Sequence, residues 1–276
     1  DSLVWKHADT ERGNCGSVRE RSVRAAARAL HEEKIHEIVW TFRGSLDKRD
    51  RTGDDVMKRG IIFDMDGTLW DSAENVAKSW NVAIRQYGVR EKELTTQDIQ
   101  GVMGKTMDVI ADILFAEFPE EKRRLLLKEC CQVENDYLRE YGGILYDQVP
   151  QTLAALKRDG YHLSIVSNCQ KGYIEAFLDH YDLWELVEDI ECYGNNLRQK
   201  GENIRLVVER NRLDEAVYVG DIQGDYDASR AAGVGFIHAA YGFGEIAEPV
   251  PELKTFADLK TFDISSASKT QNAWTM

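Results

Sequence analysis

The sequence has no long apolar run and few cysteines. Without about 18 consecutive apolar residues a chain has no membrane-spanning helix, and the N-terminus also lacks the apolar core of a signal peptide. We therefore expect no membrane partner and a cytoplasmic location. Scattered thiols in a chain of 276 residues are typical of a reducing compartment, and no Cys-x-x-Cys pair or Cys/His cluster points to zinc. The five cysteines are Cys15, Cys130, Cys131, Cys169 and Cys192.

The chain also lacks an excess of positive charge. Its formal net charge is −13 at pH 7, whereas a protein that binds DNA or RNA independently of sequence needs a basic face. We therefore expect no nucleic-acid partner. The first 57 residues hold equal numbers of basic and acidic side chains, so the acidic excess belongs to the remainder. Apolar residues make up 43% of the chain, which is enough for a hydrophobic core and argues against wholesale disorder.

The N-terminal segment differs in composition from the rest. It mixes charges densely, with one predicted helix from Ser17 to Trp40 and a linker-like stretch, rich in glycine and charge, from Arg43 to Asp55. A strand-like apolar run follows soon after Met57. We interpret residues 1–57 as an N-terminal extension, either an upstream addition to a chain whose natural start is Met57 or a regulatory or docking helix.

From Gly60 onward the sequence alternates between predicted strands and helices, which is typical of an α/β fold with a doubly wound parallel sheet, a Rossmann-like core. An all-helical block interrupts the alternation after the first strand, and we predict it to be an inserted cap domain. The predicted strands cover residues 61–63, 162–166, 187–192, 216–219 and 236–239. The predicted boundaries are 58–72 and 148–262 for the core, 73–147 for the cap and 263–276 for a polar tail.

Carboxylates follow two of these strands, at the edge of the sheet where ligands bind in open parallel sheets. Asp64 and Asp66 follow the first strand, and their i, i+2 spacing directs both to one side of an extended chain. Asp221 and Asp225 follow the strand at 216–219, at the start of a helix. Four acidic groups at one edge repel each other and a phosphate, and a hard cation such as Mg²⁺ resolves that conflict with its preference for oxygen ligands.

Polar and basic side chains are expected at the same edge. Ser167 and Asn168 end the second core strand and offer a hydroxyl and an amide to phosphate oxygens. Lys200 lies in a loop at a predicted helix start, with Arg198 as the alternative cation. Ser167 and Asp225 can equally serve as helix N-caps, and Lys200 alone could be an ordinary surface lysine.

With its motifs in this order, the chain resembles the haloacid dehalogenase superfamily of phosphohydrolases, in particular members with a helical cap such as phosphoglycolate phosphatases. The resemblance covers residues 58–251. It implies that Asp64 is the nucleophile and Asp66 the general acid/base. Ser167 resembles the hydroxyl that binds the transferring phosphoryl group, and Lys200 the lysine that offsets its charge.

The resemblance also implies a Mg²⁺ site. Asp221 and Asp225 resemble its acidic pair, and the Asp64 side chain and the Met65 carbonyl resemble its further ligands. We add Asp66 to the predicted ligands. Many relatives with a helical cap carry Lys-Pro at the motif lysine, whereas here Gly201 follows Lys200, which leaves the subgroup open. In the cap, Lys105 lies between glycines and is our candidate for substrate recognition, with solvation of its loop as the alternative.

The predicted function is a phosphoric monoester hydrolase that acts on a small phosphorylated metabolite through an aspartyl phosphate on Asp64. One alternative is a phosphomutase, which returns the phosphoryl group to a sugar. The other is a non-catalytic binding module, against which stands the presence of every expected catalytic residue. Asp66 argues against a dehalogenase, because dehalogenases of this superfamily lack the second carboxylate. The substrate is not determined, and the oligomeric state, a homodimer included, is left open.

Overall fold

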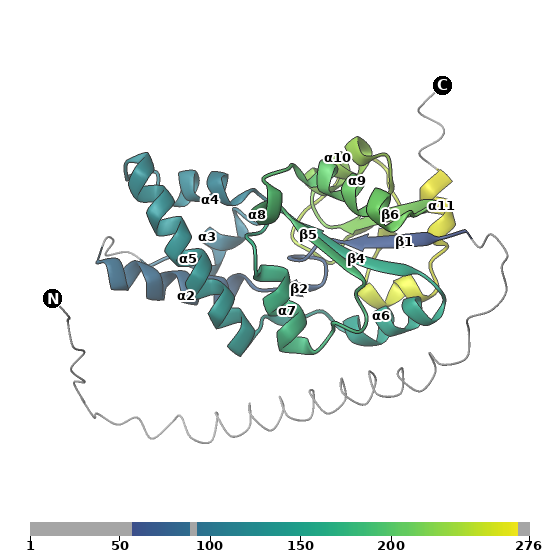
Figure 1. The fold of residues 1–276 in the computed structure, drawn as a ribbon, viewed down its shortest axis with the longest axis horizontal. Helices are drawn as coiled ribbons and strands as arrows, with labels where there is room; N and C mark the ends of the chain where they lie inside the picture. Colours follow the sequence, from purple (N-terminus) through teal and green to yellow (C-terminus); the bar gives the residue numbers. More distant parts are fainter. Residues whose placement is uncertain (1–56, 89–92, 270–276) are drawn as a thin grey trace, which may run out of the picture.

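The computed structural model describes residues 57–88 and 93–269. The N-terminal extension predicted over residues 1–57, apart from Met57, lies outside the described residues, and so does its expected helix. Figure 1 shows a lobe of helices beside a lobe built on a β-sheet. No helix in the described part of the chain is both long enough and apolar enough to cross a bilayer.

The larger lobe is a six-stranded parallel sheet with the strand order β5-β4-β1-β6-β7-β8. The predicted parallel α/β fold is therefore confirmed. The last strand, which pairs with β7, was not predicted, because a strand of two residues carries no usable periodicity. The strands are β1 (Arg59–Phe63), β4 (His162–Ser167), β5 (Asp189–Cys192), β6 (Glu215–Gly220), β7 (Gly235–Ala239) and β8 (Glu252–Leu253).

Helices cover both faces of this sheet because its central strands are buried on both sides. In β1, Ile61 and Phe63 face one hydrophobic cluster and Ile62 faces the other, as the two-residue period of a strand requires. Helices α9 (Lys200–Asn211) and α10 (Gln223–Ala232) pack on the Ile62 side. The opposite face is covered by α6 (Val149–Arg158), α7 (Tyr173–Tyr181), the 3₁₀ helix η2 (Phe256–Lys260) and α11 (Ile264–Lys269).

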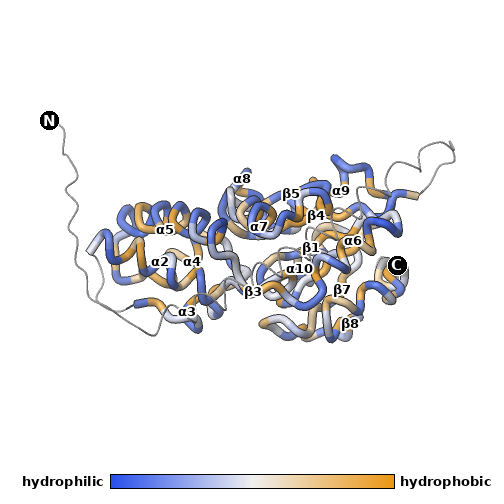
Figure 2. The backbone as a smooth tube through the Cα atoms, turned by 90° about the horizontal axis from the view of Figure 1, so that it is seen from below, coloured by the Kyte–Doolittle hydropathy of each residue, from blue (hydrophilic) through white to orange (hydrophobic). Residues whose placement is uncertain are grey.

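The second lobe is formed by helices inserted between β1 and β4. They are α2 (Ala73–Tyr87), α3 (Thr96–Gln100), α4 (Met107–Leu114) and α5 (Glu120–Tyr141). Helix α5 is amphipathic, and hydrophilic and hydrophobic residues alternate along it in Figure 2. Its buried residues recur every four positions, at Leu126, Cys130, Glu134 and Leu138, which places them on one face of the helix. One member of that otherwise apolar stripe is a carboxylic acid.

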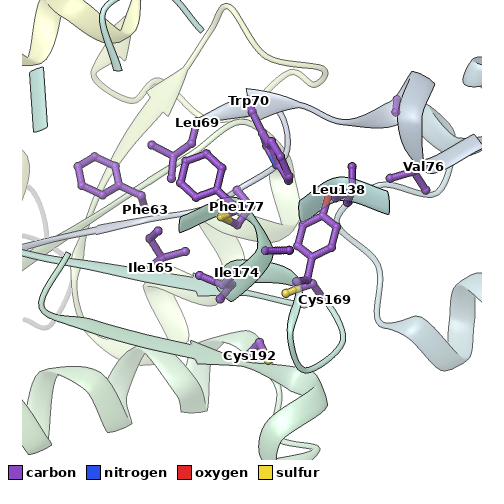
Figure 3. Packing of buried hydrophobic residues seen from close by; sticks show 14 of the residues in the cluster. Phe63, Leu69, Trp70, Val76, Leu138, Ile165, Cys169, Ile174, Phe177 and Cys192 are labelled. Carbon is purple, nitrogen blue, oxygen red and sulfur yellow. The ribbon is translucent and has the colours of Figure 1, made fainter. Parts of the chain in front are cut away.

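The two connections between the lobes form a small antiparallel ribbon. Strand β2 (Trp70–Asp71) pairs with β3 (Ile144–Leu145). The ring of Trp70 is buried against aromatic residues of α7, with its centroid 5.0 Å from that of Phe177, and Figure 3 shows these two side chains beside each other. A Cβ at Gly143 would lie 2.9 Å from Trp70 Cε3 and from the Asp71 carbonyl oxygen, so only glycine fits there.

The end of the described chain differs from its sequence-based prediction. Residues 263–276 were expected to be a polar tail, but α11 begins at Ile264, and both Ile264 and Ala267 are buried. The Ala267 carbonyl approaches Gly235 of β7 so closely that a Cβ at this glycine would lie 2.7 Å from it. The buried side chains of Ile264 and Ala267 hold α11 on the sheet. The prediction missed this helix because serines dominate its sequence.

Candidate active site

The loop after β1 presents the first pair of carboxylates. The backbone N–H of Asp64 donates to the Val219 carbonyl of the neighbouring strand at 2.9 Å, which holds Asp64 at the sheet edge. The chain then turns at Gly67, whose φ of +83° favours glycine. The carbonyl of Met65 accepts the backbone N–H groups of Thr68, Leu69 and Trp70. Three backbone hydrogen bonds engage that oxygen, which disfavours the predicted role of Met65 as a metal ligand.

Lys200 lies at the centre of the site. Its side chain is 4% exposed, and its ammonium donates to Asp64 Oδ1 at 2.9 Å and to Asp225 Oδ1 at 2.6 Å. These two carboxylates raise the pKa of Lys200 above its ordinary value against the opposing effect of burial. Lys200 starts α9, which brings it to this edge, whereas the side chain of Arg198 is exposed outside the cluster. The structure therefore places Lys200, and not the alternative cation, against Asp64.

Asp225 links this lysine to the loop after β6. Its second oxygen, Oδ2, accepts the backbone N–H groups of Asp221 and Ile222 at 3.0 and 3.2 Å. A Cβ at Gly220 would lie 2.6 Å from the Asp225 side chain, so the glycine makes room for it. Both oxygens of Asp225 thus have partners, and the residue caps the start of α10 and holds Lys200 in place.

Asp221 is the carboxylate with an unused oxygen. It is 1% exposed, its Oδ2 accepts the backbone N–H of Phe243 at 2.8 Å, and its Oδ1 is buried without a partner among the described residues. Two glycines pack directly on Asp221. A Cβ at Gly67 would lie 2.0 Å from Asp221 Oδ2, and a Cβ at Gly242 would lie 2.4 Å from Asp221 Cβ. A buried carboxylate oxygen without a donor calls for a cation or a proton.

Three of the predicted metal-ligating residues come together. Asp64, Asp221 and Asp225 each offer an oxygen within 4.8 Å of the others. Burial raises the pKa of Asp64 to about 6 and that of Asp221 to about 8, and Asp225 adds repulsion in both cases. The raised values mean that the charged forms lack sufficient positive charge nearby, even with Lys200 present. An all-oxygen donor set with an unused buried oxygen fits Mg²⁺.

The side chain of Asp66, also a predicted metal ligand, is not part of this cluster. Ser72 Oγ donates to Asp66 Oδ1 at 2.6 Å, and Tyr173 OH is 2.8 Å from both carboxylate oxygens. Burial raises the pKa of Asp66 to about 7, against the lowering effect of these hydrogen bonds. A carboxyl group that titrates near neutral pH is suited to exchange protons.

A cavity of about 50 Å³ lies between the two lobes next to Asp66. Ser167 and Asn168 line it from the loop after β4, and Lys105 lines it from the cap side. Asn168 Nδ2 donates to the Gly104 carbonyl at 2.8 Å, so the cap loop that carries Lys105 is fastened to the core beside the phosphate-binding candidates. Three of the four predicted substrate-binding residues thus line one cavity, and the fourth, Lys200, lies outside its lining against Asp64. Trp70 is not among its lining residues, and its contacts are those of hinge packing.

Three residues near the site were not predicted to have a functional role. Ser72 and Tyr173 lay within the predicted core, and Glu134 lay within the predicted cap. Of the three, only Glu134 could have been noticed in the sequence, because it is a carboxylate among apolar residues spaced four apart along a predicted helix. The contacts of Ser72 and Tyr173 with Asp66 join residues 6 and 107 positions apart, and no local pattern reports such a contact.

This chain is similar in sequence or fold to several known proteins. A phosphoglycolate phosphatase from Aquifex aeolicus is 25% identical over 198 residues, which cover 70% of this chain and 90% of that protein. A crystal structure of a predicted phosphoglycolate phosphatase from Haemophilus somnus 129PT aligns with a TM-score of 0.64 and 23% identity over 75% of this chain and 99% of that one. CbbY from Rhodobacter sphaeroides, solved with phosphate, aligns with a TM-score of 0.61 and 20% identity over 74% and 96%.

The solved structures support the fold, and the family assignment rests on a direct match. The sequence model described as haloacid dehalogenase-like hydrolase matches residues 61–239. That range runs from β1 to β7 and contains both carboxylate pairs, Ser167 and Lys200. The chain therefore belongs to the haloacid dehalogenase-like hydrolase family.

Proposed function

We propose that this chain hydrolyses a small phosphomonoester with the help of Mg²⁺, through an aspartyl phosphate on Asp64. The chain is an enzyme, a phosphoric monoester hydrolase, in keeping with its family and with the phosphoglycolate phosphatases among its relatives. What carries the finer proposal is the buried group of Asp64, Lys200 and Asp221: a nucleophile held by a cation, beside a carboxylate oxygen without a partner.

In the first step, a carboxylate oxygen of Asp64 attacks phosphorus and forms a P–O bond, while the bond from phosphorus to the ester oxygen breaks. The departing alkoxide takes a proton from Asp66, whose pKa near 7 leaves a substantial protonated fraction at neutral pH. Lys200 offsets negative charge beside the nucleophile throughout the transfer.

In the second step, water attacks the phosphorus of the aspartyl phosphate. Asp66, now ionised, accepts the proton of that water, the P–O bond to Asp64 breaks, and inorganic phosphate is released. Ser72 and Tyr173 keep the carboxyl of Asp66 fixed in both steps, since their hydrogen bonds come from one hinge residue and one core helix.

Asp64 and Asp221 would hold the metal ion, with Asp225 placing Lys200 beside them. When bound, Mg²⁺ supplies Lewis-acid stabilisation of the transferring phosphoryl group. The fit rests on the unpartnered Asp221 Oδ1 and on the all-oxygen character of the cluster.

We further propose that residues 73–147 act as a cap that closes over the core and chooses the leaving group. The hydrogen bond from Asn168 to Gly104 and the packing of Gly104 on Ile222 support it, because both join the cap loop to the edge that carries the carboxylates. The β2–β3 ribbon would be the hinge.

The decisive experiment compares the wild type with Asp64→Asn, a nearly isosteric change. The wild type should release inorganic phosphate from p-nitrophenyl phosphate, lose activity in EDTA and regain it with Mg²⁺, while Asp64→Asn should be inactive with an unchanged melting temperature. Beryllofluoride should bind the wild type and not the variant. Substantial turnover by Asp64→Asn would remove the residue from its role, and activity after exhaustive chelation would remove the metal.

A further inference from the structure

The cavity beside Asp66 contains a second acidic residue that the chemistry above does not use. Glu134 of α5 lines this cavity and is 3% exposed. Its Oε2 accepts the indole N–H of Trp80 at 2.6 Å, so the carboxyl group is held in one orientation. The rest of its buried stripe, Leu126, Cys130 and Leu138, is apolar.

One other acceptor that lines the cavity has no donor, and the protein donors near it are already hydrogen-bonded. Asn168 also lines it, and its Oδ1 is buried without a partner among the described residues. Donors nearby are engaged with the protein, since Tyr173 OH contacts Asp66 and Gln170 Nε2 donates to Asn135. Buried acceptors without donors favour a ligand that supplies donors.

The remaining wall is mostly apolar. It is formed by one face of the cap, at Val76, Trp80, Ile99, Val102, Met107 and Ile110. Lys105 is the one basic side chain that lines the described cavity, and it is exposed. Two acids, Asp66 and Glu134, therefore line a largely apolar cavity that has a single cation, Lys105, among its lining residues.

The position of the leaving group follows from the proposed function, on which this inference rests. Asp66 protonates the ester oxygen, so the carbon chain attached to that oxygen enters the cavity that Asp66 and Glu134 share. We infer that Glu134 is a specificity-determining residue, which selects leaving groups that carry a hydroxyl or ammonium donor and disfavours those with a second anionic group.

The electrostatics of the free protein agree with this geometry. Burial raises the pKa of Glu134 to about 8, with a further increase from Asp66, against hydrogen bonds from Trp80 and Gln170 that lower it. A carboxylate on the substrate would add a third acid to this space. An ammonium would instead supply the charge that the pair lacks, and a hydroxyl would satisfy Glu134 in its neutral form.

The test is a substrate series that differs in one terminal group: 2-hydroxyethyl phosphate, 2-aminoethyl phosphate, propyl phosphate and 2-phosphoglycolate, with p-nitrophenyl phosphate as the reference. Wild-type kcat/KM for the preferred donor substrate should exceed that for propyl phosphate by about 3–10-fold for the hydroxyl or about 10–100-fold for the ammonium. 2-Phosphoglycolate should rank last. The substrate with the higher kcat/KM, 2-hydroxyethyl or 2-aminoethyl phosphate, shows whether the site prefers a hydroxyl or an ammonium.

Glu134→Gln keeps the shape and an acceptor for Trp80 but removes the charge. It should reduce the preference for 2-aminoethyl over propyl phosphate about tenfold or more, and raise kcat/KM for 2-phosphoglycolate. Glu140→Gln is the matched control, because it makes the same change at an exposed position of the same helix that does not line the cavity. It should leave the ranking intact.

The wild-type ranking decides the inference even if the variant folds poorly. A preference for 2-phosphoglycolate, or equal kcat/KM for propyl and both donor substrates, would overturn it while leaving the phosphatase function standing. Unchanged discrimination in a folded Glu134→Gln would remove Glu134 from the role. No turnover of any substrate, p-nitrophenyl phosphate included, would instead overturn the proposed function, and the inference with it.

Discussion

Replacement of Lys200 by methionine tests the electrostatic structure of the site most directly. Methionine has a similar length and preserves packing, but it removes the ammonium that lies 2.9 Å from Asp64 Oδ1 and 2.6 Å from Asp225 Oδ1. Both carboxylates stay buried. Breaking a buried ion pair by removal of one partner costs about 3–5 kcal/mol, and here the lysine serves two carboxylates.

We therefore expect Lys200→Met to lower the free energy of unfolding of the metal-free protein by at least about 3 kcal/mol at pH 8.5. At about 2–4 °C per kcal/mol for a chain of this size, the melting temperature should fall by about 6–20 °C. The rate constant kcat should fall by about 10²–10³-fold, as for other losses of a charge-stabilising donor.

The stability loss should depend on pH in a defined direction. Asp64 and Asp221 have pKa values raised to about 6 and about 8, above their usual 3.8. The folded state therefore binds more protons than the unfolded state from about pH 4 to pH 8, and metal-free stability falls as pH rises through that window. Lys200 lowers both values, so its loss should cost more at pH 8.5 than at pH 5.5, where protonated carboxyls need no counter-charge.

The measurement is thermal and urea unfolding in EDTA at both pH values. Lys78→Met is the control, since Lys78 is an exposed lysine paired with Glu74 on α2, where a surface pair contributes less than about 1 kcal/mol. Equal losses for the two variants at pH 8.5, or a Lys200→Met deficit that grows toward acid pH, would refute the assignment of Lys200 as the counter-charge of a buried carboxylate cluster.

Three further predictions concern individual groups. Asp221→Ala should raise the Mg²⁺ concentration needed for half-maximal activity more than Ser167→Ala does; equal shifts in a Mg²⁺ titration would count against Asp221 as a ligand. With an alkyl phosphate, kcat/KM should fall as pH rises through about 7 because Asp66 loses its proton. Asp66→Asn should abolish this decrease of kcat/KM with pH and lower the rate about 10²–10⁴-fold. If the decrease persists in the variant, another group is responsible for it. Lys105→Ala should raise KM for a substrate that contacts the cap yet spare p-nitrophenyl phosphate, and equal damage to both would indicate a structural role instead.

Much of the fold was predictable from local sequence because its elements carry strong local signals. Buried strands such as Ile61–Phe63 are short apolar runs, and α2 and α5 repeat apolar residues with helical spacing. Weak signals failed. Strands of two residues, at β2, β3 and β8, owe their existence to neighbours distant in the chain, and α11 was concealed by its serines.

The sequence predicted which site residues lie close together, because the strands of a parallel sheet end at the same edge. Asp64, Lys200, Asp221 and Asp225 could be expected at one edge because parallel strands deliver their carboxyl ends there. The sequence could not show how their hydrogen bonds are shared. Asp225 has both oxygens engaged by Lys200 and by backbone N–H groups, whereas Asp221 retains a buried oxygen without a partner.

The sequence by itself thus determined the family, the sheet and the residues available for phosphoryl transfer, because these follow from periodicity and from motifs a few residues long. Only the tertiary structure decided what each group faces. In the folded chain the Met65 carbonyl accepts hydrogen bonds within a tight turn, and the Asp66 carboxyl accepts hydrogen bonds from Ser72 and Tyr173. Glu134 of the cap lines the same cavity as Asp66. The contacts of Tyr173 with Asp66 and of Trp80 with Glu134 join segments far apart in the chain. There burial and hydrogen bonding, and not local propensity, determine the charge and role of a side chain.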